Sequence, residues 1–250
     1  MQISNKETWS SSYQPLITVV TVVRNGEKTI QNTIDSIAKQ TFDNFEYIII
    51  DGESTDSTTN IIKDNSKSIF KCISEPDNGI YDAMNKGISL ASGKWLIFIG
   101  ADDVLVNNEI LSKVSNFLQY ENCIYYGDVL LKSSNKRYCG PISTYKLMQQ
   151  NICHQAIFYP SSLYKKKKYD IHSGLLADYK YNIEVWASSF QFIYIPIIIT
   201  IFSDTGASSN PGQHFESMRL KLIYENFGRK WYLIKRTRNM FRNVFKALKS

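Results

Sequence analysis

Runs of β-branched residues alternate, along the first part of the chain, with segments whose apolar residues recur at helical spacing. Leu16–Val23 (LITVVTVV) is almost continuously β-branched and is followed by a turn at residues 24–26. Apolar residues then recur at helical spacing over Ile30–Ala38, and Phe45–Ile50 (FEYIII) is the next apolar run. Strands buried on both faces have this composition, and the strand–helix–strand order favours a parallel sheet with helices on both faces.

The same alternation continues further along the chain. Helices are expected over Thr58–Lys63 and Tyr81–Ala91, and strands over Ile69–Ser74 and Trp95–Ile99. We therefore predict an α/β fold with a mainly parallel, Rossmann-like sheet. Open sheets of this type bind ligands at the carboxyl ends of their strands, so the residues after each strand are candidates for a functional site.

Acidic residues follow three successive predicted strands. Asp51 ends the second strand, Glu75 and Asp77 follow the third, and Asp102 and Asp103 follow the fourth. Carboxylates gathered at one edge of a sheet repel one another unless a cation or the hydrogen-bond donors of a ligand lie between them. The pattern therefore predicts a magnesium or manganese site.

The sequence lacks the two glycine-rich motifs that commonly bind phosphate. The sequence contains neither a G-x-G-x-x-G nor a G-x-x-x-x-G-K-[ST] motif, so phosphate is expected to bind through the metal. Asp56 lies just before a predicted helix, and we assign it to the helix start rather than to the site.

Composition limits the class of protein. Of the 250 residues, 43% are hydrophobic, which is enough for one large core. The four cysteines and three histidines match no zinc spacing, and we expect reduced thiols in a cytosolic protein. Phe192–Phe202 is the most apolar stretch, but it has 11 residues and contains Pro196, so we expect a buried strand rather than a membrane-spanning helix. The polar residues 1–15 are expected to form a flexible leader.

Two stretches carry a family resemblance. Residues 17–58 (ITVVTVVRNGEKTIQNTIDSIAKQTFDNFEYIIIDGESTDST) resemble the opening of the family-2 glycosyltransferases. Residues 74–103 (SEPDNGIYDAMNKGISLASGKWLIFIGADD) resemble the bacterial subgroup that builds O-antigens, capsules and colanic-acid-like polysaccharides. Weaker similarity continues through Tyr125–Asp128 (YYGD) and His154–Pro160 (HQAIFYP), so the resemblance covers about residues 16–208.

The resemblance implies a GT-A fold. A nucleotide-sugar-binding half would occupy residues 16–104 and an acceptor-binding half residues 105–210, with a helical basic segment over residues 211–250. Asp51 is similar to the residue that hydrogen-bonds the nucleotide base in this family.

Three further residues are assigned to the donor nucleotide by the same resemblance. It implies that Arg24 and Asn25 lie beside the base and that Asp77 contacts the base or the ribose.

The family's metal motif is usually Asp-x-Asp, whereas this chain has Gly100-Ala101-Asp102-Asp103, with Gly100 in place of the leading Asp. The resemblance assigns Asp102 and Asp103 to Mn²⁺ or Mg²⁺ and to the donor diphosphate. Such an ion neutralises charge on the departing nucleoside diphosphate.

An inverting transfer also needs a base for the acceptor hydroxyl. Asp178, early in a predicted helix, resembles the family's base, although the helix dipole alone would favour an acid there. Glu184 is a second candidate on another side of that helix. His154 and Gln155 resemble a motif near the sugar and acceptor, although a lone histidine is often only a packed residue, and Ser203–Ser209 resembles a loop that closes the site.

The net positive charge belongs to the end of the chain. Residues 229–249 hold eight basic and no acidic residues, whereas residues 1–228 hold 21 basic and 23 acidic ones. A basic amphipathic helix over Phe227–Leu248 fits an interfacial anchor on anionic lipid, and a helix packed on the domain with a solvated basic face is the alternative. The expected apolar half holds Trp231, Leu233, Ile234, Met240, Phe241, Val244, Phe245 and Leu248, and the basic half holds Lys235, Arg236, Arg242, Lys246 and Lys249.

The acidic strand ends and the family resemblance together imply a metal-dependent, inverting glycosyltransferase. We expect it to move a hexose or hexosamine from a UDP-sugar to a lipid-linked saccharide in surface polysaccharide synthesis, at the inner face of the plasma membrane. A homodimer is compatible with this prediction. An inactive family member that acts as a scaffold, with Gly100 as the lesion, is the alternative. Nucleic-acid binding is disfavoured because the expected rim is acidic.

Overall fold

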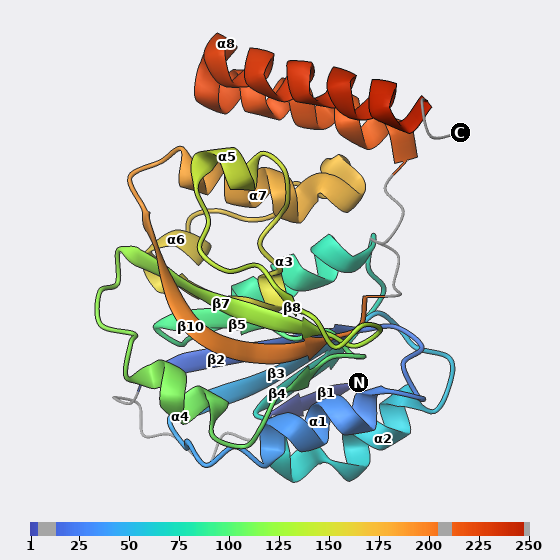
Figure 1. Cartoon of the computed structure of the whole chain (residues 1–250). Coiled ribbons are helices and arrows are strands. Elements are labelled where there is room, and N and C mark those ends of the chain that lie inside the picture. Colours follow the sequence, from blue (N-terminus) through green and yellow to red (C-terminus); the bar gives the residue numbers. More distant parts are fainter. Residues whose placement is uncertain (5–13, 205–211, 248–250) are drawn as a thin grey trace.

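The computed structural model describes residues 1–4, 14–204 and 212–247 (Figure 1). Their strands form one ten-stranded mixed sheet with the order β1-β4-β3-β2-β5-β9-β7-β10-β6, and β8 pairs with β7. The strands are β1 (Gln2–Ser4), β2 (Ile17–Val23), β3 (Phe45–Asp51), β4 (Lys71–Ser74), β5 (Trp95–Phe98), β6 (Val104–Leu105), β7 (Cys123–Leu131), β8 (Arg137–Tyr138), β9 (Ile157–Pro160) and β10 (Gln191–Phe202). The helices are α1 (Ile30–Ala38), α2 (Thr58–Asp64), α3 (Ile80–Leu90), α4 (Ile110–Ser115), α5 (Thr144–Leu147), α6 (Ser161–Tyr164), α7 (Ala177–Trp186) and α8 (Gly212–Ala247), with short 3-10 helices η2 (Ser66–Ser68), η3 (His154–Ala156) and η4 (Ile171–Leu176).

The predicted α/β fold is confirmed. Strands β4, β3, β2 and β5 are mutually parallel, so their carboxyl ends meet at one edge of the sheet. Beyond β5 the sheet becomes mixed, because β9 inserts antiparallel to both β5 and β7, while β10 runs parallel to β7.

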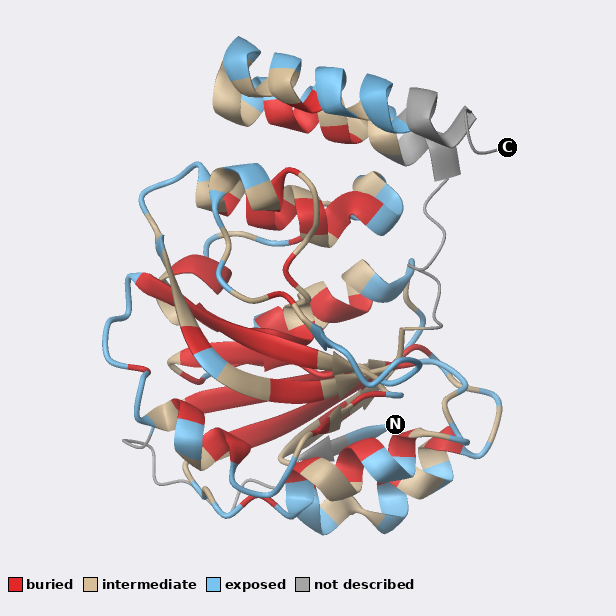
Figure 2. Ribbon diagram, in the orientation of Figure 1, coloured by how far each residue is buried: buried red, intermediate tan, exposed pale blue. Residues whose placement is uncertain are grey.

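Two apolar layers cover the sheet. Helices α1, α2 and α4 pack on one face, and α3 and α7 pack on the other (Figures 1 and 2). Neighbouring residues of β2 alternate between them, since Val19 belongs to the first layer and Val20 to the second. Each central strand therefore contributes side chains to both apolar layers.

Two predictions outside the central strands have different outcomes. We expected residues 1–15 to form a flexible leader. Residues 1–4 instead contain strand β1, which pairs antiparallel with β4. Residues 5–13 of the leader lie outside the described part. The apolar run around Pro196 forms β10 as predicted, although much of it is only half-buried. Within the described ranges, no helix is long and apolar enough to cross a membrane.

Helix α8 consists of two arms. They meet at Gly228, whose φ of 80° suits glycine and interrupts the helical backbone. The arms run antiparallel, because Asn239 Nδ2 donates to Glu216 Oε2 over 3.1 Å and the rings of Tyr224 and Tyr232 lie 5.7 Å apart (Figure 1). The helix expected from Phe227 is therefore the second arm of a helical hairpin.

Lys235 corrects the expected division of this helix. We placed it on the solvated basic half, but it is 1% exposed, and its Nζ donates to Gln149 Oε1 over 3.0 Å. Its nearest carboxylate oxygen, on Glu216, is 3.9 Å away. Burial, reinforced by the charge of Arg219, lowers the pKa of Lys235 to about 8.

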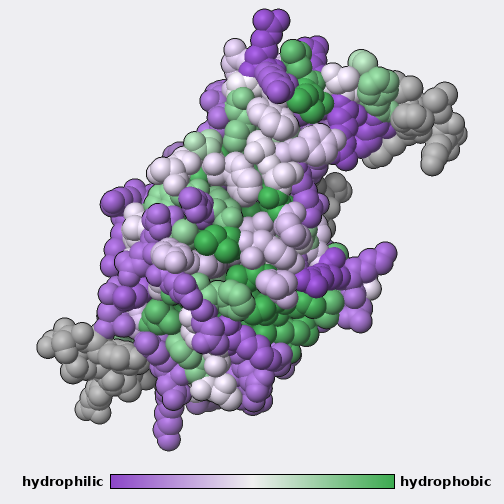
Figure 3. All heavy atoms as spheres, turned by 60° about the vertical axis from the view of Figure 1, so that its left-hand side comes forward, coloured by the Kyte–Doolittle hydropathy of each residue, from purple (hydrophilic) through white to green (hydrophobic). Residues whose placement is uncertain are grey.

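The orientation of the second arm that buries Lys235 leaves apolar residues of the same arm in solvent. Leu233, Met240 and Phe241 are 46%, 59% and 56% exposed. Arg229, Lys230 and Arg236 on this arm are also exposed. The outward face therefore mixes apolar and basic side chains, and Figure 3 shows apolar and hydrophilic atoms side by side on the α8 hairpin at the top of the molecule. The side chains of residues 243–250 lie outside the described ones.

Replacing Lys235 by Met should stabilise the fold at pH 7, because it removes a buried charge. We expect the free energy of unfolding to rise by about 1 to 3 kcal/mol. Above pH 8 the folded-state lysine loses its proton while the unfolded-state lysine keeps it up to about pH 10.4. The wild-type protein should therefore recover stability across this window, and the advantage of Met should shrink.

Urea unfolding of both proteins from pH 7 to pH 10 measures this difference. Arg236→Met, at the exposed neighbouring position, is the control and should change stability little. A Lys235→Met protein that is less stable than the wild type at pH 7 would contradict the expected cost of burial.

Candidate active site

A cavity of about 930 Å³ opens at the carboxyl edge of the parallel strands. One wall comes from the turn after β2, with Arg24, Asn25 and Gly26, and from the turn after β5, with Asp102 and Asp103. The opposite wall comes from η3 and from the start of α7. This is the place where the strand pattern predicted a site.

The turn after β2 is locked to the turn after β3. Asn25 has a φ of 55°, its backbone N–H donates to Ser54 Oγ over 2.7 Å, and its Oδ1 accepts from Thr55 N over 2.8 Å. Arg24 is exposed beside it and lines the cavity. The structure thus places both predicted residues at the cavity mouth.

Asp51 is fully buried and organises its own turn. Its carboxylate accepts from Ser54 N over 3.2 Å and from Ser74 Oγ over 2.6 Å, and it lies behind the cavity lining. Asp77 packs over Gly52, the residue after Asp51, because a methyl group placed at Gly52 would lie 2.1 Å from Asp77 Oδ2. Asp77 thus lies against the backbone next to Asp51, but neither acid lines the cavity that Asp102 and Asp103 line, so the acids after the three strands do not gather at one site as predicted.

Asp56 takes the structural role assigned to it. Its Oδ1 accepts from Thr58 N over 3.0 Å at the start of α2, and its Oδ2 accepts from Glu27 N over 3.1 Å. Asp56 thus holds the start of α2, one residue before the N-cap Ser57, and ties it to the turn after β2; it also lines the cavity.

Asp102 and Asp103 differ sharply in their surroundings. Asp102 is exposed and lines the cavity, whereas Asp103 is 1% exposed. The Asp103 carboxylate accepts from Ser203 N over 2.7 Å, from Gln155 Nε2 over 3.0 Å and from Gly100 N over 3.2 Å. Burial raises the pKa of Asp103 to about 6, and the charge of Asp102 adds to the rise.

The close approach of Asp103 explains the unusual Gly100. A methyl group placed on Gly100 would lie 2.5 Å from Asp103 Oδ2. A larger residue here would displace the buried carboxylate from its backbone donor.

The donor set decides which kind of metal site fits. The described residues contain no group of three or more His, Cys, Asp or Glu side chains that could hold an ion. Asp102 is the exposed carboxylate, and the oxygens of Asp103 already accept hydrogen bonds. This arrangement fits an Mg²⁺ or Mn²⁺ ion that takes most of its ligands from phosphate and water, as such ions commonly do.

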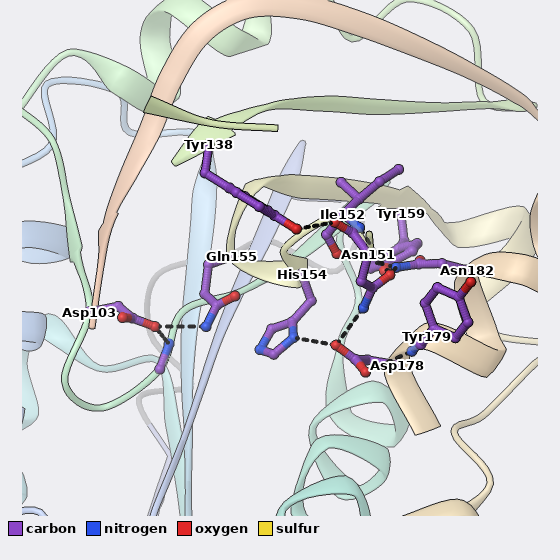
Figure 4. Close-up of polar contacts among 11 residues, drawn as sticks. Asp103, Tyr138, Asn151, Ile152, His154, Gln155, Tyr159, Asp178, Tyr179 and Asn182 are labelled. Carbon is purple, nitrogen blue, oxygen red and sulfur yellow. Dashed lines mark hydrogen bonds and ion pairs between the residues drawn. The ribbon is translucent and has the colours of Figure 1, made fainter. Parts of the chain in front are cut away.

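Asp178 faces the same cavity from the first turn of α7 (Figure 4). Its Oδ2 accepts from Asn151 Nδ2 over 2.8 Å and lies 3.6 Å from His154 Nδ1. The side chain is 18% exposed. Burial, followed by the charge of Asp178, raises the pKa of Tyr81 on α3, which also lines the cavity.

His154 and Gln155 join the two acidic parts of the site. Gln155 reaches Asp103, and its neighbour His154 lies beside Asp178 (Figure 4). The His154 ring also makes an edge contact with Phe98 at 6.4 Å, so it is packed as well as polar. Glu184, the second candidate for the base, forms ion pairs with Lys167 and Lys180 instead.

Several residues of the site escaped prediction. Asn151 contacts Asp178, Tyr138 OH donates to Asn151 O over 2.9 Å, and Ser203 N reaches Asp103. Asn151 lies three residues before His154, but no motif distinguishes it. Of the Ser203–Ser209 loop, residues 205–209 lie outside the described part.

Comparisons with known proteins agree on a family. The model of the family described as "Glycosyl transferase family 2" matches residues 18–176. A PGL/p-HBAD biosynthesis glycosyltransferase of Mycobacterium bovis is 35% identical over 204 residues, which cover 78% of this chain and 80% of that protein. The Escherichia coli UDP-Glc:alpha-D-GlcNAc-diphosphoundecaprenol beta-1,3-glucosyltransferase WfgD is 29% identical over 121 residues, 48% of each chain.

Solved structures share the fold. Staphylococcus aureus TarS 1-349 in complex with UDP has a TM-score of 0.68 at 18% identity, over 84% of this chain and 64% of that one. TarS 1-349 has also been solved with UDP-GlcNAc. The mannosyltransferase PcManGT from Pyrobaculum calidifontis, in complex with GDP-Man and Mn²⁺, has a TM-score of 0.62 at 14% identity, over 91% of this chain and 65% of that one. The present chain thus spans just under two thirds of each of those two chains.

The two neighbouring aspartates should respond differently to substitution. Asp103→Ala leaves Gln155 Nε2 and Ser203 N without their acceptor, and we expect a loss of about 2 to 4 kcal/mol in the free energy of unfolding. Asp102→Ala, at an exposed position, should change it by less than about 0.5 kcal/mol. Urea unfolding without added metal measures both, and Asp103→Asn, which keeps one acceptor oxygen, should restore part of the loss. Equal stability of the two alanine variants would contradict the structural role of Asp103.

Proposed function

Since the chain belongs to glycosyltransferase family 2, a family of nucleotide-sugar-dependent enzymes, we propose that it transfers a hexose or hexosamine from a UDP-sugar, with inversion, to a lipid-linked saccharide. One observation carries this proposal. The exposed carboxylate of Asp102 and the carboxylate of Asp178 face one cavity from opposite walls, so a donor diphosphate and an acceptor hydroxyl could be held on either side of the sugar.

Asp178 is the proposed base. It would accept the proton of the acceptor hydroxyl as that oxygen forms a bond to the anomeric carbon. The bond from this carbon to the donor phosphate breaks on the opposite face, and the nucleoside diphosphate leaves with the electron pair. His154, 3.6 Å from the Asp178 carboxylate, is placed to contact the acceptor or the sugar.

The donor would bind at the other wall. We assign the nucleotide to the region around Arg24, Asn25, Asp51 and Asp77, and the structures of TarS with UDP and UDP-GlcNAc favour a uridine donor. Asp102 would hold Mn²⁺ or Mg²⁺, with Asp103 supporting its turn. Such an ion neutralises charge that develops on the diphosphate. The Mn²⁺ in PcManGT supports this assignment.

The acceptor assignment is supported by the names of two relatives and by α8. One relative is named for PGL/p-HBAD biosynthesis and the other for a diphosphoundecaprenol acceptor, and we infer an acceptor of cell-surface glycan synthesis. The exposed face of the second α8 arm combines Leu233, Met240 and Phe241 with basic residues. Such a face suits the boundary of an anionic bilayer, and we propose that the enzyme docks there at the inner face of the plasma membrane.

Asp178→Asn should lower sugar transfer by about a hundredfold or more, because the amide cannot accept the proton. Binding of UDP with Mn²⁺ should stay unchanged, whereas Asp102→Asn should weaken it. Release of nucleoside diphosphate from UDP-, GDP- and dTDP-sugars, with Mn²⁺ or EDTA and with a diphosphoundecaprenol-linked monosaccharide as acceptor, measures turnover. Isothermal titration calorimetry measures binding.

Glu184→Gln is the matched control and should keep turnover, since Glu184 pairs with lysines away from the cavity. Near-normal transfer by Asp178→Asn would rule out the base assignment. Failure to release any nucleotide from any donor would instead favour the inactive scaffold.

Membrane docking can be tested in the full chain. The triple variant Leu233→Asp, Met240→Asp, Phe241→Asp should lower co-sedimentation with vesicles that contain phosphatidylglycerol by about tenfold or more, because it removes apolar contact and adds like charge. Phe117→Asp, at another exposed apolar residue, is the control and should bind like the wild type. Equal binding by the triple variant and the control would exclude this face as the docking surface.

A further inference from the structure

A chain of three hydrogen bonds leads from the sheet to Asp178 (Figure 4). Tyr159 OH pairs with Asn182 Oδ1 over 2.9 Å, Asn182 Nδ2 donates to Asn151 Oδ1 over 2.9 Å, and Asn151 Nδ2 donates to Asp178 Oδ2 over 2.8 Å. We propose that Asn151, held by Asn182 and Tyr159, is a positioning residue that orients the Asp178 carboxylate for proton transfer. The inference rests on the proposed role of Asp178 as base.

The orientation of the Asn151 amide follows from its other contacts. Its Oδ1 accepts from the backbone N–H of Ile152 over 2.9 Å, and a backbone N–H can only donate. The oxygen must therefore face Ile152 and Asn182. This leaves Nδ2 toward Asp178, where it can only donate.

The orientation of the Asn182 amide is fixed in the same way. Its Nδ2 lies 3.3 Å from Ile152 O, and a carbonyl oxygen can only accept. Its Oδ1 must then accept from the Tyr159 hydroxyl. The amide N–H of Asn151 is therefore fixed toward the Asp178 carboxylate, and the two hydrogen bonds behind it run in the same direction.

Burial and helix geometry make this arrangement rigid. Asn182 is 0% exposed and Tyr159 is 1% exposed, so neither side chain can turn toward solvent. Asn182 follows Asp178 by four residues on α7, which places both on one face of the helix. The Asp178 Oδ1 atom accepts from Tyr179 N over 2.6 Å, so both carboxylate oxygens are held.

Other groups around Asp178 must be considered in any test. The titratable groups that face or influence it are His154 from η3, Tyr81 from α3, Tyr138 from β8, Cys153 from the loop before η3, Tyr159 from β9 and Tyr169 from the loop before η4. A substitution at Asn151 changes none of these side chains and keeps the backbone oxygen that Tyr138 OH contacts. A change in the pH midpoint of the Asp178 carboxyl can then be assigned to the loss of the Asn151 amide donor.

Asn151→Leu removes the donor at nearly constant size. We expect the pH midpoint of the carbon-13 resonance of the Asp178 carboxyl, assigned with Asp178→Asn, to rise by about one to two pH units. Turnover at pH 7, with the nucleotide sugar that the wild type cleaves fastest, should fall by about tenfold to a hundredfold while the KM for that donor stays unchanged. The acidic limb of the pH profile of turnover should move up by the same amount.

Asn85→Ala is the matched control. Asn85 on α3 also makes two long-range hydrogen bonds, to the backbone N and O of Tyr169, but it does not contact Asp178. It should lower stability without moving the midpoint or the pH profile. Asn151→Ala, which removes the donor without adding bulk to the loop, serves if Asn151→Leu does not fold, and the same changes are expected of it.

The outcomes separate the two proposals. An unchanged midpoint in both Asn151 variants would overturn the positioning role, whatever the turnover. A raised midpoint together with full activity of Asp178→Asn would leave the hydrogen-bond chain intact and would overturn the base assignment alone.

Discussion

The buried carboxylate of Asp103 joins three segments that are far apart in the sequence. It accepts hydrogen bonds from Gly100 after β5, from Gln155 in η3 and from Ser203 after β10. A charge buried among donors of this kind holds its neighbours firmly, because releasing any one of them leaves a polar group unpaired in the interior. The three segments that meet at this side chain all contribute to the cavity lining, through Gly100, Gln155 and Ser203.

The hydrogen bonds to Asp103 also give the two adjacent aspartates different surroundings. With Asp103 turned inward, Asp102 is turned outward into the cavity, where its carboxylate is free to meet a ligand. The absence of a side chain at Gly100 lets Asp103 approach the backbone, so the departure from the usual Asp-x-Asp pattern fits a tightly packed turn. Gln155 then connects this turn to His154 and, through it, to the wall that carries Asp178.

How far the sequence predicts this structure depends on how local each feature is. The strands and the helices follow from residue spacing and from the rules of parallel sheets, and they lie where expected. Of the acids expected at one site, Asp102 and Asp103 line the cavity, whereas Asp51 and Asp77 do not. The burial of Lys235 and the contact of Asn151 with Asp178 do not follow from spacing. Each depends on how α7, α8 and the loop before η3 pack, which is a tertiary property that one sequence does not show.

The packing of the α8 hairpin is also a tertiary property that residue spacing does not show. The hairpin connects the helix of the proposed base to the proposed membrane-docking face. On its inner side, Arg219 Nε donates to Tyr179 OH over 3.0 Å, and Tyr179 is the neighbour of Asp178. On its outer side, the second arm presents Leu233, Met240 and basic residues to solvent. If this outer face meets lipid, the helix that carries the proposed base is tied through Arg219 to the membrane-bound hairpin. A lipid-linked acceptor would then reach Asp178 from the surface on which the enzyme rests.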